Sequence, residues 1–220
     1  MFYSISSKIS KANNILGAIR RSFSYLDETT LLQLYTALVR PILEYANPVW
    51  SPRYVRDIIS IENIQRRATK MIPTIKDLPY EDRLKHLRLP TLAYRRLRGD
   101  MIESYKILNK KYDPKVSNFL TLHRDKVANP DKVRSCLKLY KENHSIKLRK
   151  QSFAFRIVEP WNSLPKSVVT APSLASFERR LDKFWESQNL RYNFRETLRI
   201  AHTNNTPHDI GSGDEGLDLA

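Results

Sequence analysis

Apolar residues return every third or fourth position through the first half of the chain, which is the spacing of one face of an α-helix. This pattern predicts an amphipathic helix over about residues 7–24 and another that begins after Asp27 or Thr29, either of which can cap it. An apolar stripe from Leu31 to Ile42 runs along the second helix. Pro41 interrupts this helix, and we expect a kink there because proline has no backbone N–H to donate.

Three more helices are predicted from the same periodicity, over about residues 54–72, 80–88 and 91–109. Prolines and polar residues replace the periodic pattern at four places, near Leu26, Asn47–Pro52, Pro73–Pro79 and Pro90. Together these signals predict that residues 7–109 are almost entirely helical, with breaks at those four places.

The pattern changes in the second half of the chain, where polar residues and prolines around Tyr112–Pro130 predict a linker. Beyond it, partial alternation of apolar and polar positions favours short β-strands up to a turn over Glu159–Pro165. The alternating residues are Val133, Leu137, Leu139, Ile146, Leu148, Phe153, Phe155 and Ile157. A last amphipathic helix is expected after Pro172 and Ser173, with Leu174, Phe177, Leu181, Phe184 and Trp185 on its apolar face.

The predicted fold class is therefore mainly α. We expect a helical bundle over residues 1–111, a linker over 112–131 and a small α+β extension over 132–188. The remaining residues, 189–220, are acidic at their end and contain glycines, which predicts a disordered tail.

The chain is strongly basic, with 38 Lys and Arg against 23 Asp and Glu and a formal net charge of +15. The excess follows Trp50: residues 53–111 hold 15 basic and 7 acidic side chains, whereas residues 201–220 hold 4 acidic and no basic ones. Such a charge is typical of a nucleic-acid-binding protein, although an anionic membrane partner or a merely solvated cationic surface fits the same number.

One helix concentrates this charge on a face of its own. In the helix over 54–72, isoleucines, Ala68 and Met71 cluster on one side, and the opposite arc carries four cations and no acid: Arg56, Arg66, Arg67 and Lys70. A solvated face is the alternative interpretation. We interpret the arc as a phosphate-binding surface, with a second patch formed by Arg95, Arg96 and Arg98.

Several blocks of the sequence resemble, in the same order, the region that follows the polymerase palm in jockey-like reverse transcriptases of non-LTR retrotransposons. The blocks are Leu38–Trp50 (LVRPILEYANPVW), Ile64–Lys70 (IQRRATK), Tyr80–Leu84 (YEDRL), Leu89–Asp100 (LPTLAYRRLRGD) and Phe155–Pro165 (FRIVEPWNSLP). The resemblance covers about residues 8–187. It implies a thumb-like helical region that packs against a template–primer duplex, either an RNA–DNA hybrid or another duplex, whatever its sequence.

The fingers and palm of that family are absent from this sequence, and so is the paired-Asp motif that holds its catalytic Mg²⁺. Two-metal polymerase chemistry needs carboxylates that converge on two cations. The nearest pairs here are Glu81 with Asp82, which fits the start of a helix, and Asp100 with Glu103, which fits ion pairing to Arg98 and Lys106. We therefore expect no catalytic residue, no metal site and no cofactor, although the parent polymerase would use Mg²⁺.

The sequence gives no support for a reactive cysteine, a histidine metal site or a membrane segment. The single cysteine, Cys136, is predicted to be a small buried residue. The five histidines, His86, His123, His144, His202 and His208, lack the spacing of metal ligands. No window approaches the ~20 apolar residues of a membrane span, and the N-terminus lacks the apolar core of a signal peptide. We expect an intracellular protein with no membrane partner, in either the nucleus or the cytoplasm.

The leading hypothesis is a C-terminal fragment of a reverse transcriptase, an RNA-directed DNA polymerase in its parent protein. The fragment would bind nucleic acid without regard to sequence and would have no catalytic centre, and its partners would include the missing palm and fingers of the same element. Two alternatives stay open: a basic protein-interaction module that binds an acidic partner, and a non-functional relic of a decayed element.

Overall fold

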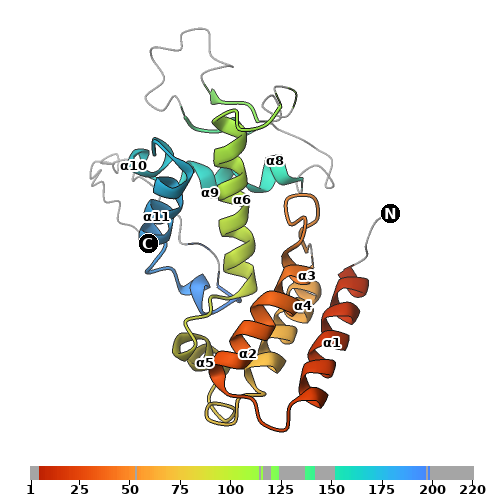
Figure 1. Cartoon of the computed structure of the whole chain (residues 1–220). Helices are drawn as coiled ribbons and strands as arrows, with labels where there is room; N and C mark the ends of the chain where they lie inside the picture. The colour runs from red at the N-terminus through yellow and green to blue at the C-terminus, as the bar shows by residue number, and fades with distance from the viewer. Residues whose placement is uncertain are drawn as a thin grey trace, which may run out of the picture.

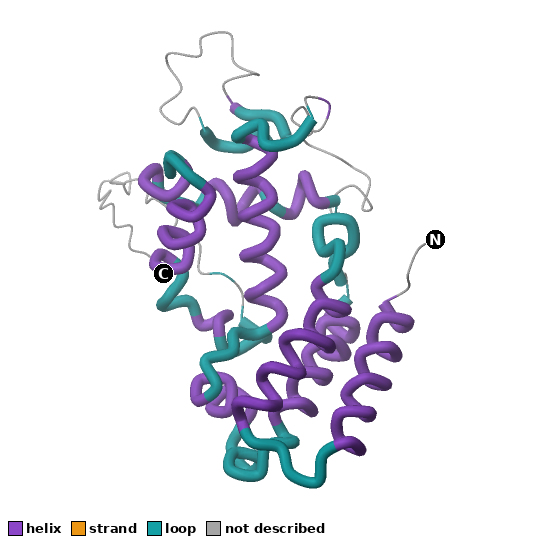
Figure 2. The backbone as a smooth tube through the Cα atoms, viewed as in Figure 1, coloured by secondary structure: helices purple, strands orange, loops and turns teal. Residues whose placement is uncertain are grey.

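A computed structural model describes residues 5–52, 54–113, 115, 120–123, 137–141, 152–196 and 198. Over these ranges the chain forms helices joined by turns and loops and no β-strand (Figure 2). The mainly α fold predicted from the sequence is confirmed. None of the described helices is long and apolar enough to cross a bilayer.

Five helices pack together in the first part of the chain (Figure 1). They are α1 (Ile5–Ser22), α2 (Glu28–Leu34), α3 (Arg40–Glu44), α4 (Val55–Thr69) and α5 (Tyr80–His86). Their apolar stripes meet in one cluster, the N-terminal core, which includes the fully buried side chains of Leu31, Leu43, Ile61, Ile64 and Leu84. Each such side chain contributes roughly 1.5–3 kcal/mol by leaving water.

The helical turn that precedes Pro41 is wider than an α-helical turn. Between α2 and α3 the backbone forms a π-helical turn, η1 (Tyr35–Val39), in which the Arg40 N–H donates to the Tyr35 carbonyl oxygen. Because Pro41 has no N–H and its ring crowds the preceding turn, one extra residue in the turn relieves the clash. The α-helix is therefore interrupted before Pro41 by a π-turn.

The predicted helix boundaries also agree with the structure. Asp27 caps α2, and its carboxylate accepts the Thr30 N–H at 3.1 Å. Thr91 caps the long helix α6 (Leu92–Leu108) by accepting the Tyr94 N–H at 3.1 Å. The breaks near Leu26, Asn47–Pro52, Pro73–Pro79 and Pro90 all separate helices of the described chain.

Helix α6 leaves the N-terminal bundle and runs into a second group of helices (Figure 1). These are α8 (Phe153–Arg156), α9 (Val158–Asn162), α10 (Lys166–Val169) and α11 (Leu174–Phe184). They form the C-terminal core with α6, in which the Phe177 ring stacks on Tyr105 and Trp161 at centroid distances of 4.4 and 5.9 Å. The last predicted helix, after Ser173, is confirmed as α11.

The expected strands are the main error of the fold prediction. The helical segment that begins with α8 contains Phe153, Phe155 and Ile157, which were expected in a strand. Helix α9 occupies the first part of the range 159–165, where a turn was expected. The one β-type pairing in the described residues is a single antiparallel bridge between Leu122 and Leu139. The expected strand positions Val133, Ile146 and Leu148 lie outside the described residues.

The two cores do not divide at residue 111. Leu92 belongs to the N-terminal core, whereas Tyr94, Met101 and Tyr105 of the same helix belong to the C-terminal core, so the division falls at the start of α6. Within the predicted linker, Leu120 and Leu122 are buried in the C-terminal core. Helix α6 therefore joins the two cores as a continuous element, with no linker between them.

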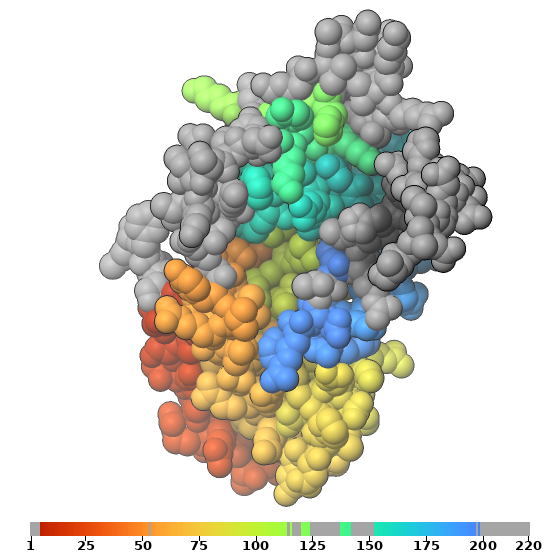
Figure 3. Space-filling model, turned by 180° about the vertical axis from the view of Figure 1, so that it is seen from behind, coloured from red at the N-terminus to blue at the C-terminus, as the bar shows by residue number. Residues whose placement is uncertain are grey.

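The predicted tail begins too early. Residues 189–196 start with a 3-10 turn, η5 (Asn189–Arg191), and lie across the surface beside α4 and α5 (Figure 3). The Thr91 hydroxyl donates to the Leu190 carbonyl oxygen at 2.7 Å, and the Phe194 ring meets the Tyr80 ring edge-on at 6.5 Å. The sequence missed this segment because its apolar residues are few and not periodic. Residues 199–220 lie outside the described chain.

Candidate nucleic-acid interface

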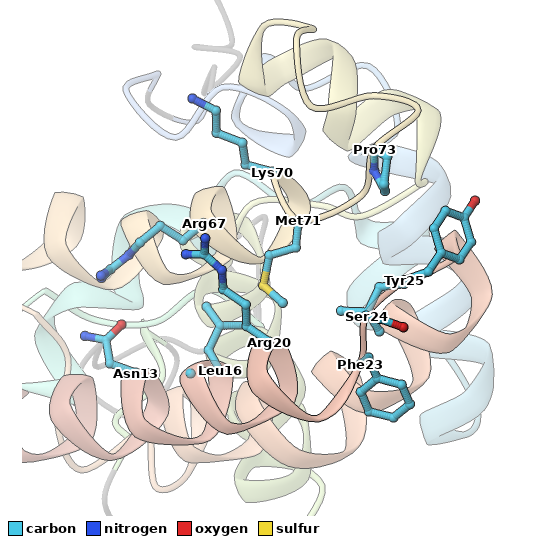
Figure 4. Close-up of a pocket in the computed structure, with 12 residues that line it drawn as sticks. Asn13, Leu16, Arg20, Phe23, Ser24, Tyr25, Arg67, Lys70, Met71 and Pro73 are labelled. Atoms are coloured by element: carbon cyan, nitrogen blue, oxygen red, sulfur yellow. The ribbon is translucent and has the colours of Figure 1, made fainter.

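A groove with a volume of about 650 Å³ opens between α1 and the C-terminal end of α4 (Figure 4). Its apolar lining includes Leu16 of α1 and Met71, which follows α4. Three cationic side chains also line it: Arg20 from the last turn of α1, Arg67 from the last turn of α4, and Lys70 just beyond. Figure 4 shows Arg20 extending from α1 toward α4 and Lys70 pointing away from the other two.

These cations have no anionic neighbour in the described part of the chain. All three side chains are exposed, and no described carboxylate lies within 4.0 Å of their charged nitrogens. Arg67 makes one weak internal contact, from Nε to the Asn63 carbonyl oxygen at 3.3 Å. No acidic residue lines the groove. The arrangement gives a concave positive surface, which attracts the phosphates of a polyanion.

The structure does not bring the four cations predicted on one face of α4 into a single cavity. Arg56, with a side chain 81% exposed, lies 3.6 Å from Asp57 at the opposite end of the helix from the groove. Arg66 faces the returning C-terminal segment, with its guanidinium over the Tyr80 and Phe194 rings at 5.1 and 5.7 Å. Arg67 and Lys70 remain as the members of the set that share a cavity.

The structure does not place the second predicted patch, Arg95, Arg96 and Arg98, as three free cations on the surface. Arg96 is only 6% exposed, and burial lowers its pKa. Arg95 forms a two-point ion pair with Glu44, in which Nη2 lies 2.9 Å from Oε2. Arg98 pairs with Asp182 of α11 at 2.6 and 2.9 Å. Arg95 and Arg98 bind carboxylates of this chain, and hydrogen bonds to these raise the pKa of both guanidinium groups.

A buried polar cluster ties the turn after α3 to α6 and α8. The Arg156 guanidinium contacts both carboxylate oxygens of Asp100, at 2.8 and 3.0 Å, and donates to the Asn47 carbonyl oxygen at 3.0 Å. Asn47 in turn donates to Asp100 Oδ1 at 2.9 Å. Burial raises the pKa of Asp100, while its hydrogen bond and charge pairing with Arg156 act in the opposite direction. The Asp100 carboxylate is bound by both Arg156 and Asn47, so we infer that the cluster stabilises the fold.

A second buried network closes the start of α6. Glu62, fully buried, accepts the Leu92 N–H with both oxygens, at 3.2 and 3.1 Å, and the Tyr80 hydroxyl at 2.7 Å. Burial raises the pKa of Glu62, and the hydrogen bond from Tyr80 partly offsets that rise. Gln65 extends the network by accepting the Tyr35 hydroxyl at 2.7 Å. The Glu62 side chain thereby binds the N-terminus of α6.

Three of the four carboxylates considered in the sequence analysis, Asp82, Asp100 and Glu103, have ion-pair partners. Asp82 lies 3.5 Å from Lys85 and Glu103 lies 3.5 Å from Lys106, the ion pairs of a helix surface. His86 contacts Glu28 at 3.0 Å. Among the described residues no three His, Cys, Asp or Glu side chains converge as metal ligands would. Cys136, His144, His202 and His208 lie outside the described residues.

Sequence reasoning missed Arg20 and the two aromatic residues at one end of the groove, Phe23 and Tyr25. It treated the first helix only as an apolar stripe. A charge signal was available, because the first 26 residues contain four Lys or Arg and no Asp or Glu.

Comparison with known proteins identified no similar protein. No protein-family model, no curated protein and no solved structure matches the chain.

Proposed function

We propose that this chain is a nucleic-acid-binding module that holds phosphates in the groove between α1 and α4 and does not read sequence. The observation that carries the proposal is the set of Arg20, Arg67 and Lys70, three cations that line one groove with no described carboxylate within ion-pair distance. Unpaired cations gathered on a concave surface repel one another, so an anionic ligand stabilises them.

The resemblance to the region that follows the palm in non-LTR retrotransposon reverse transcriptases supports the same proposal. In that interpretation the chain is the thumb and C-terminal part of an RNA-directed DNA polymerase, and it has no catalytic centre of its own. Phosphate contact fits such a role, because a polymerase must accept every sequence that it copies. Beyond the three cations, the polar lining of the groove includes Asn13 and Ser24.

The test is fluorescence anisotropy of labelled nucleic acids of arbitrary sequence, titrated with the full chain from low to moderate salt. If three phosphates are bound, log K falls with log[salt] at a slope of about −2.7 on duplex DNA or about −2.1 on a single strand. The variant R20A/R67A/K70A should lose most of this slope. The matched control K166A/R179A/K183A removes the same charge from exposed positions on α10 and α11 and should retain it.

Two results would overturn the proposal, provided that thermal melts show all variants folded. One is a slope that the groove variant and the control reduce equally, because net charge alone would then explain binding. The other is equal or tighter binding of an acidic polypeptide at the same groove, which would establish the protein-interaction alternative.

A further inference from the structure

Resting on the proposed function, we infer that the groove receives a single strand of nucleic acid, with bases stacked on Phe23 and Tyr25 and phosphates on Arg20 and Arg67. This departs from the duplex that the sequence led us to expect. Two observations support a single strand: the exposed aromatic rings at one end of the groove and the concave shape of the groove.

Phe23 and Tyr25 lie in the turn between α1 and α2 and line one end of the groove (Figure 4). Phe23 is 40% exposed and Tyr25 is 66% exposed. Within the described chain, no aromatic ring stacks on either of them and no cation lies over them. By contrast, the ring of the exposed Tyr54 has the Arg56 guanidinium 5.0 Å from its centre. Phe23 and Tyr25 therefore offer open ring faces at one end of the groove that the cations line.

An aromatic surface beside a cationic groove is the combination that single-strand-binding proteins use. Successive bases stack on aromatic rings whatever their identity, while cations track the backbone. A duplex cannot use such rings, because its bases are already paired and stacked inside the helix. The rings at the groove end thus favour a strand whose bases are free.

The shape of the groove favours one strand as well. Its cations come from two different helices, Arg20 from α1 and Arg67 from α4, and they line a concave space with an apolar floor at Leu16 and Met71. One backbone can lie between the two helices with phosphates toward the cations. A duplex is convex and would touch only the rim.

The experiment compares oligo-dT of about twelve nucleotides, within the site sizes of single-strand-binding folds, with a duplex of equal length and arbitrary sequence. Anisotropy of the full chain at one salt concentration gives both affinities. We expect the single strand to bind at least about tenfold more tightly, as stacking of one or two bases predicts. Oligo-U should bind within a few-fold of oligo-dT, since neither stacking nor phosphate contact requires the 2′-hydroxyl.

Two variants test whether the rings of Phe23 and Tyr25 stack on the bases. F23L/Y25L removes both rings while retaining apolar side chains, and it should weaken single-strand binding roughly tenfold or more without changing duplex binding. Y25F retains the ring and should bind as the wild type does. A photo-crosslink from 5-iodouracil in the oligonucleotide should map to Phe23 or Tyr25.

The outcomes separate this inference from the proposed function. If F23L/Y25L binds the single strand like the wild type while R20A/R67A/K70A does not, phosphate binding stands and the stacked single strand is wrong. Duplex binding as tight as single-strand binding overturns the inference in the same way. If neither variant changes binding of either nucleic acid, both the inference and the proposed function fail.

Discussion

The Arg156 guanidinium and the Asp100 carboxylate form a two-point ion pair at 2.8 and 3.0 Å, with Asp100 almost wholly buried. The pair joins α8 to the middle of α6. Through the Asn47 carbonyl oxygen, Arg156 also holds the turn that follows α3. One side chain thus links the N-terminal bundle, the long helix and the C-terminal core.

Replacing Arg156 with Ala should lower the free energy of unfolding by about 3–5 kcal/mol, because Asp100 is left buried without its counter-charge. The check is urea denaturation followed by circular dichroism. R98A is the comparison: its carboxylate partners are 36% and 47% exposed, and its loss should cost about 0.2–1 kcal/mol. A double-mutant cycle with D100A isolates the pair, and equal costs for R156A and R98A would contradict this account.

Glu62 should give the protein a pH-dependent stability. Burial raises its pKa in the folded state above the usual 4.5, so between the two pKa values the folded chain holds a proton that the unfolded chain has lost. The free energy of unfolding must then fall as pH rises from the unfolded pKa to the folded one, and remain level above it. Asp100 has a pKa raised in the same direction, so the measurement compares wild type with E62Q. We expect their stability difference to change as the pH rises from the usual 4.5 toward the raised pKa of Glu62, and a constant difference would refute the prediction.

The Thr91 hydroxyl should stabilise the fold through two hydrogen bonds that a Ser side chain can also make and a Val side chain cannot. Its hydroxyl oxygen caps α6 by accepting the Tyr94 N–H, and the same hydroxyl donates to the Leu190 carbonyl oxygen. T91V should cost about 1–3 kcal/mol and speed amide hydrogen exchange in residues 190–193, whereas T91S should retain most of both properties. Urea titration and exchange mass spectrometry measure the two effects. T91S as unstable as T91V would show that the methyl group, and not the hydroxyl, stabilises this site.

The guanidinium groups of Arg95 and Arg98 should contribute to stability and not to nucleic-acid binding. Both are already bound to carboxylates of this chain, Glu44 and Asp182. R95A/R98A should lower the melting temperature and leave the salt dependence of binding unchanged. The double variant R20A/R67A should show the reverse, with a slope reduced by up to about 1.4 units on single-stranded DNA. A flattened slope in folded R95A/R98A would restore the second patch predicted from sequence.

The purified chain should extend no primer. We expect this because the sequence has no paired-Asp motif to hold two catalytic cations. The measurement supplies primer–template, nucleotides and Mg²⁺ or Mn²⁺, with a retroviral reverse transcriptase as positive control. Extension above the level without protein would show that the chain has a catalytic centre.

Most of the helical framework could be predicted because each helix up to α6 carries a regular apolar stripe and a clear break at either end. The region around Phe153 could not be predicted, since its spacing fits two structures. Phe153 and Ile157 are four positions apart, and both are buried on one side of a helical segment. Adding the partly buried Phe155 makes the same residues alternate as in a strand.

The candidate site was harder to predict because a helical wheel shows which residues share a face and not what covers that face. Arg66 lies in the predicted basic arc, yet Phe194, a residue far along the chain, packs against it. Arg96 is buried for a similar reason, at the meeting of α6 with other helices. Arg20 escaped notice because its partner in the groove, Arg67, lies on a helix that is distant in sequence.

The bond between Thr91 and Leu190 spans 99 positions, and it has a consequence for the order of folding. Chains emerge from the ribosome N-terminus first, and domains generally fold in that order. We therefore expect the N-terminal core to assemble on the nascent chain while the start of α6 still lacks the contact that Leu190 provides. Leu190 must be synthesised before its carbonyl oxygen can bind Thr91 at the first turn of α6. We therefore expect the segment around Leu190 to fix the start of this helix late in synthesis.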